Sequence, residues 1–173
     1  MSGIRRALGP LERVNGRWIL GDHLRPGGTW LELRPEGLYQ ISGESEGQSI
    51  PWPRVMLVGF TLGARYPQKG SYGVLALLGG LPGPWKGRGR GYLHLTLRHP
   101  YENWLASFDR HPRWYDSTEL VLFGELLRQT VDEGEANRLA DSDWLGRAVE
   151  LLVTQRPRTP GGVREAVARA RQL

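Results

Sequence analysis

The sequence contains no cysteine, which excludes a disulfide framework, a thiol nucleophile and any zinc site that uses cysteine. It also lacks an apolar run of about 18 residues, the length that a membrane-spanning helix needs. The two arginines near the N-terminus are not followed by an apolar segment of signal-peptide length. We therefore expect a cytoplasmic protein without thiol chemistry.

Lysine is scarce, since only Lys69 and Lys86 accompany the arginines that supply the rest of the positive charge. The formal net charge of +5 suits nucleic acid, an anionic membrane surface or an acidic protein as partner. The charge is uneven, because residues 114–155 carry −6 whereas residues 84–113 and 156–173 carry +4 each. The basic segments are therefore predicted either to bind an outside anion or to lie against the acidic region of the same molecule.

The first sixty residues have the pattern of antiparallel strands joined by tight turns. Asn15-Gly16 lies between short apolar runs, and both residues tolerate the positive φ angles of a two-residue hairpin turn. A second hairpin is predicted between residues 30–34 and 38–42, with the turn supplied by residues 35–37. This half of the chain is therefore expected to form a β-sheet.

The pattern changes from strand to helix in the second half of the chain. A strand with one solvent-facing side is predicted at residues 92–98, where three leucines alternate with polar side chains, so His94 should point outward. After this strand the apolar period lengthens from 2 to 3.6. That period predicts helices over residues 100–110, 118–133 and 142–153.

Three further features belong to this second half. Asp116 stands three residues before Glu119, a spacing typical of a helix N-cap. Trp104 lies on the apolar face of the helix predicted over residues 100–110. Residues 156–173 have a narrow apolar face and high positive charge, so we expect them to form a flexible basic tail.

The first half of the chain contains a recognisable order of segments. LELRPEGLYQI at residues 31–41 is followed by a turn and then by IPWPRVMLVG at residues 50–59. This order resembles small bacterial proteins of the pleckstrin-homology-like (PH-like) superfamily, over roughly residues 15–112. The residues that contribute most to the resemblance are Ile50, Pro51, Trp52 and Val55.

The resemblance implies a binding scaffold rather than an enzyme, with residues 92–98 as its closing strand and residues 100–110 as its capping helix. We therefore predict an α+β fold in which an N-terminal antiparallel β barrel or bent sheet precedes three C-terminal helices. Its parts would be a PH-like domain over residues 1–112, a helical extension packed on it over residues 113–155, and the tail at residues 156–173.

One segment is a candidate anion site. Residues 63–91 contain nine glycines and end in alternating glycines and basic residues, although they match neither a P-loop nor a dinucleotide fingerprint. Backbone N–H groups in such a loop can turn toward an anion. The side chains predicted to surround the anion are Lys86, Arg88, Arg90 and Arg98. The same segment could instead be a plain solvated connection between two strands.

We predict a non-catalytic binding or scaffolding module that recognises a protein or an anionic ligand. No catalytic residue, cofactor or metal is expected, a membrane surface is a weaker candidate partner, and both a monomer and a homodimer remain open. One alternative is single-stranded nucleic-acid binding through residues 84–92, where arginines would contact phosphates and Trp85 and Tyr92 would stack on bases. A second alternative is a small enzyme that uses a histidine cluster. This cluster would consist of His94, His99 and His111.

Overall fold

The computed structural model describes residues 7–43, 45–62 and 89–173. Its larger sheet is antiparallel throughout and contains six strands that follow one another in chain order. These strands are β1 (Ala7–Leu8), β2 (Leu11–Val14), β3 (Arg17–Leu20), β4 (Thr29–Arg34), β5 (Gly37–Ser42) and β6 (Ser45–Pro51).

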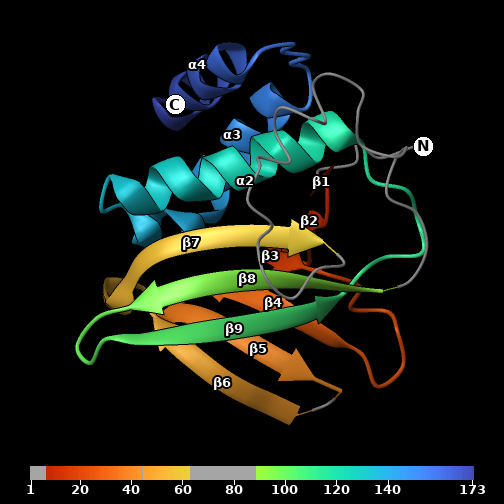
Figure 1. The fold of residues 1–173 in the computed structure, drawn as a ribbon. Helices are drawn as coiled ribbons and strands as arrows, with labels where there is room; N and C mark the ends of the chain where they lie inside the picture. The colour runs from red at the N-terminus through yellow and green to blue at the C-terminus, as the bar shows by residue number, and fades with distance from the viewer. Residues whose placement is uncertain (1–6, 44, 63–88) are drawn as a thin grey trace.

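A smaller antiparallel sheet and three helices complete the described fold. The short 3-10 helix η1 (Trp52–Arg54) leads into the smaller sheet, which consists of β7 (Val55–Leu62), β8 (Arg90–Leu97) and β9 (Glu102–Asp109). The helical part contains α2 (Ser117–Asp132), the 3-10 helix η2 (Ala136–Ala140), α3 (Ser142–Leu152) and α4 (Pro160–Arg171). Figure 1 shows the helices above the strands, with α2 running along β7.

The predicted α+β class, with strands first and helices afterwards, is confirmed. The barrel form of the prediction is not met in the described ranges. β1 and β6 end the larger sheet and β7 and β9 end the smaller one, so neither sheet closes on itself. No helix in the described part of the chain combines the length and the apolar composition needed to cross a membrane.

Both predicted hairpins are present in the larger sheet. Asn15 and Gly16 have φ angles of 50° and 80° and join β2 to β3, so the turn uses the left-handed conformations that this residue pair tolerates. Arg34 pairs with Gly37 where β4 meets β5, as the second hairpin requires. Local turn chemistry was therefore sufficient to locate these strands.

The helix predicted over residues 100–110 is wrong, because this segment forms β9. Its residues pair in register with β8 from Glu102 opposite Leu97 to Asp109 opposite Arg90. Trp104 and Phe108 are four residues apart, so they share a face under a helical period and also under a strand period of 2. Pairing with β8 decides between the two, and Trp104 lies half-buried on a strand with its Nε1 donating to Gln48.

The helices predicted over residues 118–133 and 142–153 are confirmed as α2 and α3. The side chain of Asp116 accepts hydrogen bonds from the backbone N–H groups of Thr118 and Glu119 at 2.8 and 3.2 Å. This is the N-cap that the spacing predicted. Such caps typically stabilise a helix by about 1 kcal/mol.

The expected flexible tail is instead an ordered helix, α4, which packs on α2 and α3. Its narrow apolar face suffices because the small side chains let the helix approach closely. The four side chains buried on this face are Val163, Ala166, Val167 and Ala170. Arg156 pairs with Asp116 at 2.9 Å and Arg171 pairs with Glu135 at 3.5 Å. The basic C-terminal segment therefore lies against the acidic region of its own molecule, as one of the two charge-based predictions stated.

The smaller sheet has an inner and an outer face. Three leucines of β8 point inward and are at most 4% exposed, as the alternation predicted; they are Leu93, Leu95 and Leu97. Phe60 of β7 packs edge-on against Phe123 of α2, with ring centroids 4.9 Å apart. The inner face thus forms part of the core together with α2, and the alternate residues of β7, β8 and β9 form the outer face.

Candidate functional site

Of the four predicted anion-binding side chains, the structure describes Arg90 and Arg98 and does not bring these two together. Lys86 and Arg88 lie outside the described residues. Arg90 is exposed at the first position of β8, and Arg98 follows the last position of the same strand. A strand of this length spans about 26 Å, so Arg90 and Arg98 cannot hold one small anion between them. Arg98 also donates from its Nε to the carbonyl oxygen of Pro53 at 2.8 Å, which ties it to η1.

The predicted histidine cluster does not form. His99 and His111 lie at opposite ends of the β8–β9 hairpin, and His94 lies between them on β8. His94 Nε2 is 2.9 Å from the hydroxyl of Thr61, so it has a local partner of its own. Among the described residues, no three histidine or acidic side chains are grouped in a way that could hold a metal ion.

His111 belongs instead to a polar network that joins the β9–α2 connection to β2. Its Nε2 is 2.8 Å from Glu12 Oε1, and its Nδ1 is 2.6 Å from the hydroxyl of Tyr115. The backbone N–H of His111 also donates to that hydroxyl, at 2.8 Å. In a neutral imidazole this geometry places the ring proton on Nε2, so that Tyr115 donates to Nδ1 and Nε2 donates to Glu12.

Two more basic side chains face the Glu12 carboxylate. His23 Nδ1 and Arg113 Nη2 each lie 3.7 Å from one of its oxygens. Burial raises the pKa of Glu12, but the hydrogen bond from His111 and the positive charges of His111, Arg113 and His23 outweigh burial and hold this pKa below its usual value. Burial likewise raises the pKa of Tyr115 to about 12, so its hydroxyl stays protonated at physiological pH.

The lowered pKa of Glu12 predicts a loss of stability in acid. Glu12 binds a proton less readily in the folded chain, so its stabilising effect is complete above its unfolded pKa of about 4.5 and is lost as the pH falls through the lower folded value. Urea unfolding of the wild type and Glu12→Gln, from about pH 7 down to about pH 3, measures this effect. The stability advantage of the wild type should shrink below about pH 4.5; an advantage that stays constant across this range would contradict the assignment.

The histidine and tyrosine of this network, His111 and Tyr115, are closed to a substrate. The side chains of His111 and Tyr115 are buried, with exposed fractions of 6% and 1%, and each of their polar atoms is used in an internal hydrogen bond. The neighbouring carboxylate of Asp109 is also used in internal hydrogen bonds. It accepts from Arg25 at 3.0 Å and from the backbone N–H of Thr29 at 2.8 Å. The Asp109 contacts fix the loop after β3 to the end of β9, and the Glu12–His111 contact fixes β2 to the β9–α2 connection.

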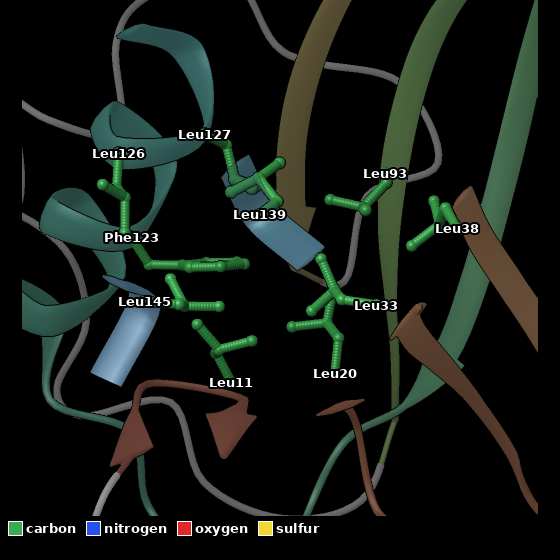
Figure 2. Close-up of a pocket in the computed structure, with 10 residues that line it drawn as sticks. All are labelled: Leu11, Leu20, Leu33, Leu38, Leu93, Phe123, Leu126, Leu127, Leu139 and Leu145. Carbon is green, nitrogen blue, oxygen red and sulfur yellow. The ribbon is translucent and has the colours of Figure 1, made fainter. Parts of the chain in front are cut away.

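An apolar cavity in the core is too small to be a ligand site. It lies between the two sheets and the helices, and Figure 2 shows its lining side chains pointing toward one another. The lining residues are Leu11, Leu20, Leu33, Leu38, Leu93, Phe123, Leu126, Leu127, Leu139 and Leu145. The space open to the centre of a water-sized sphere is about 10 Å³, which is about the room that one water requires. We interpret it as a packing gap.

The outer face of the smaller sheet is a candidate binding surface, and of its residues Thr61 is buried, with 2% of its surface exposed. It is formed by three residues from each strand, namely Leu57, Gly59 and Thr61 of β7, Tyr92, His94 and Thr96 of β8, and Asn103, Leu105 and Ser107 of β9. None of these nine residues is acidic. Arg90 precedes Tyr92 by two positions, so it extends the same row of β8, and it is exposed. Asp109 of β9 lies directly opposite Arg90.

Sequence reasoning located part of this surface and missed the buried network. The alternation in residues 92–98 placed His94 outward, and Arg90 was predicted as a ligand-binding residue. Glu12 and Tyr115 were not predicted, because Glu12 is 99 residues from its partner His111 and no local pattern links them. Comparison of the chain with protein-family models, curated proteins and solved structures finds no match.

Proposed function

We propose that the protein is a non-catalytic binding module whose main partner is anionic and binds the outer face of the smaller sheet. The observation that supports this proposal is the charge of that face. Arg90 is exposed at its edge and none of its nine residues is acidic. Asp109 lies opposite Arg90 but is already paired with Arg25 at 3.0 Å. The groups best suited to acid–base chemistry, by contrast, are buried in internal hydrogen bonds around Glu12 and His111.

Retention on immobilised heparin, a linear polyanion, tests the proposal. Arg90→Glu should elute at clearly lower salt than the wild type, because it places an acid on the binding face. The matched control is Arg147→Glu, which changes the net charge by the same amount at an exposed position of α3. The control should elute close to the wild type. Equal shifts for the two variants would show that only net charge matters and would refute a defined binding face.

A protein partner is a second candidate, supported by two exposed apolar side chains. Leu24 and Trp114 are 78% and 57% exposed, and each follows a residue that faces the Glu12 carboxylate, His23 and Arg113 respectively. Large exposed side chains on fixed loops suit a protein interface. If this were the main binding surface, heparin retention would not depend on Arg90.

The proposal includes a PH-like scaffold. Two observations support it. The resemblance implies a closing strand followed by a covering helix, which it assigned to residues 92–98 and 100–110. In the structure, β9 followed by α2 has this arrangement. Trp52, a residue of the resemblance, is buried, and its Nε1 donates to the carbonyl oxygen of Arg34 at 2.8 Å, which joins η1 to the end of β4. A binding scaffold of this type needs no cofactor.

A further inference from the structure

The outer face of β8 presents a regular row of side chains. Arg90, Tyr92, His94 and Thr96 alternate with inward residues and therefore lie on one side of the strand, and Arg98 follows its end. The row spans about 26 Å from one arginine to the other. This length and linearity suit an extended polymer better than a single small anion.

Aromatic rings accompany these cations in two places. The rings of Tyr92 and His94 have centroids 6.4 Å apart and an interplanar angle of 43°. The same arrangement recurs at the β8–β9 turn, where His99 and Tyr101 are 6.2 Å apart, also at 43°, and Tyr101 is 74% exposed. Within each pair the rings are tilted rather than stacked, so they do not cover each other's faces. Ring faces beside cations are what single-stranded nucleic-acid binders use for bases and phosphates.

Hydrogen-bonding groups flank the row. Thr96 and Asn103 are 3.4 Å apart on neighbouring strands, and Ser107 lies opposite Tyr92. Acidic groups near the ends of the row are already neutralised. Asp109 is paired with Arg25, and Glu102 is paired with Arg54 at 2.7 Å. The row therefore offers positive charge, ring faces and hydroxyl or amide groups together.

Other anions fit this row less well. A small phosphate compound would need converging donors and an enclosed site, whereas the arginines stand at opposite ends of the strand. A lipid headgroup has no flat aromatic ring to stack on the two ring pairs, and an acidic peptide does not carry such a ring beside each of its charges. The alternation of phosphates and flat bases along a single strand matches both the charges and the rings.

We propose that β8 and the β8–β9 turn bind an extended single strand of nucleic acid. Arg90 and Arg98 contact its phosphates, and the rings of Tyr92, His94 and Tyr101 stack on its bases. This proposal rests on the function proposed above, since it names the occupant of the same face. The proposed contact surface consists of the outer face of β8 and the β8–β9 turn.

Fluorescence anisotropy with labelled oligonucleotides of about 12 residues tests the proposal, a length within the range that one such module covers. The probes are oligo(dT), oligo(rU) and a DNA duplex, and each is titrated with the full chain. Tyr92→Leu should weaken single-strand binding about five- to hundredfold, because it removes a stacking ring. Tyr92→Phe is the matched control; it keeps the ring and should bind like the wild type. Thermal melts of both variants verify that they are folded.

Salt dependence tests the phosphate contact separately. Arg90→Ala should lower the slope of log K against log salt concentration by about 0.7, the value for one lost phosphate contact on a single strand. Arg147→Ala on α3 should leave the slope unchanged. Preference for oligo(dT) or oligo(rU) shows whether the natural strand is DNA or RNA.

The outcomes separate this inference from the broader function. Equal affinity of Tyr92→Leu and the wild type, or binding of duplex as tight as binding of single strand, would overturn the single-strand proposal. If heparin retention depended on Arg90 at the same time, the anion-binding function would stand with a different occupant. Absence of both effects would refute the two proposals together.

Discussion

Replacing Trp18 by alanine is expected to lower the free energy of unfolding by about 3–5 kcal/mol. Trp18 lies on β3 with only 1% of its surface exposed, and its ring packs beside Gly146 of α3. Its Nε1 also donates to the backbone oxygen of Ser142 at 3.1 Å, and the Ser142 hydroxyl donates to the carbonyl oxygen of Gly16 at 2.8 Å. The substitution would therefore open a cavity and remove the hydrogen bond that joins β3 to α3.

Urea unfolding monitored by circular dichroism measures this loss, and two variants serve as controls. Trp18→Phe keeps most of the apolar volume but not the N–H donor, so it should cost much less than Trp18→Ala. Trp114→Ala removes the same side chain from a position that is 57% exposed and should also cost far less. Similar losses for the two alanine variants would show that Trp18 does not anchor α3.

Replacing Gly91 by alanine should destabilise the protein by about 3 kcal/mol, because the new methyl group would overlap a buried ring. An added Cβ would lie 2.6 and 2.8 Å from the two Cε atoms of Phe108 and closer still to its Cζ. Phe108 has no exposed surface and stacks on Phe60, so its ring has little room to move away. Thermal or urea unfolding of the variant measures the effect.

A second substitution shows whether the overlap is the cause. Phe108→Leu removes the part of the ring that the new methyl group would meet. The loss of stability in the double variant, Gly91→Ala with Phe108→Leu, should therefore be smaller than the sum of the two single losses by about 1 kcal/mol. The control is Gly59→Ala on β7, where the nearest atom is the Cβ of His94 at 3.8 Å. It should change stability by less than about 1 kcal/mol. Additive losses would show that the glycine is needed for another reason.

The elements predicted correctly are those with local signals. The turn at Asn15-Gly16, the alternation along β8 and the cap at Asp116 each depend on residues only a few positions apart. The helix predicted at residues 100–110 was wrong because the spacing of its apolar residues fits two periods. The choice between them was made by pairing with β8.

The packing of α4 and the network around Glu12 depend on contacts that are distant in the sequence. The charge pattern gave contact between the C-terminal segment and the acidic helices as one of two alternatives, and it did not indicate that the segment would be ordered. The residues of the outer face were accessible to sequence reasoning only along β8, since Thr61 and Ser107 join it through the registers of β7 and β9. The alternation along β8 alone defines one row of residues, whereas the pairing of all three strands defines the outer face.

The bonds between the first strands and the helices also affect the synthesis of the chain. Trp18 meets Ser142 across 124 positions, and the backbone N–H of Gly9 donates to Glu119 across 110. A nascent chain emerges from the ribosome N-terminus first, so the leucines and Trp18 of the larger sheet have no cover until α2 and α3 have been made. High contact order of this kind slows folding. Chaperones that shield apolar strands during translation would thus act mainly before the last third of the chain has emerged.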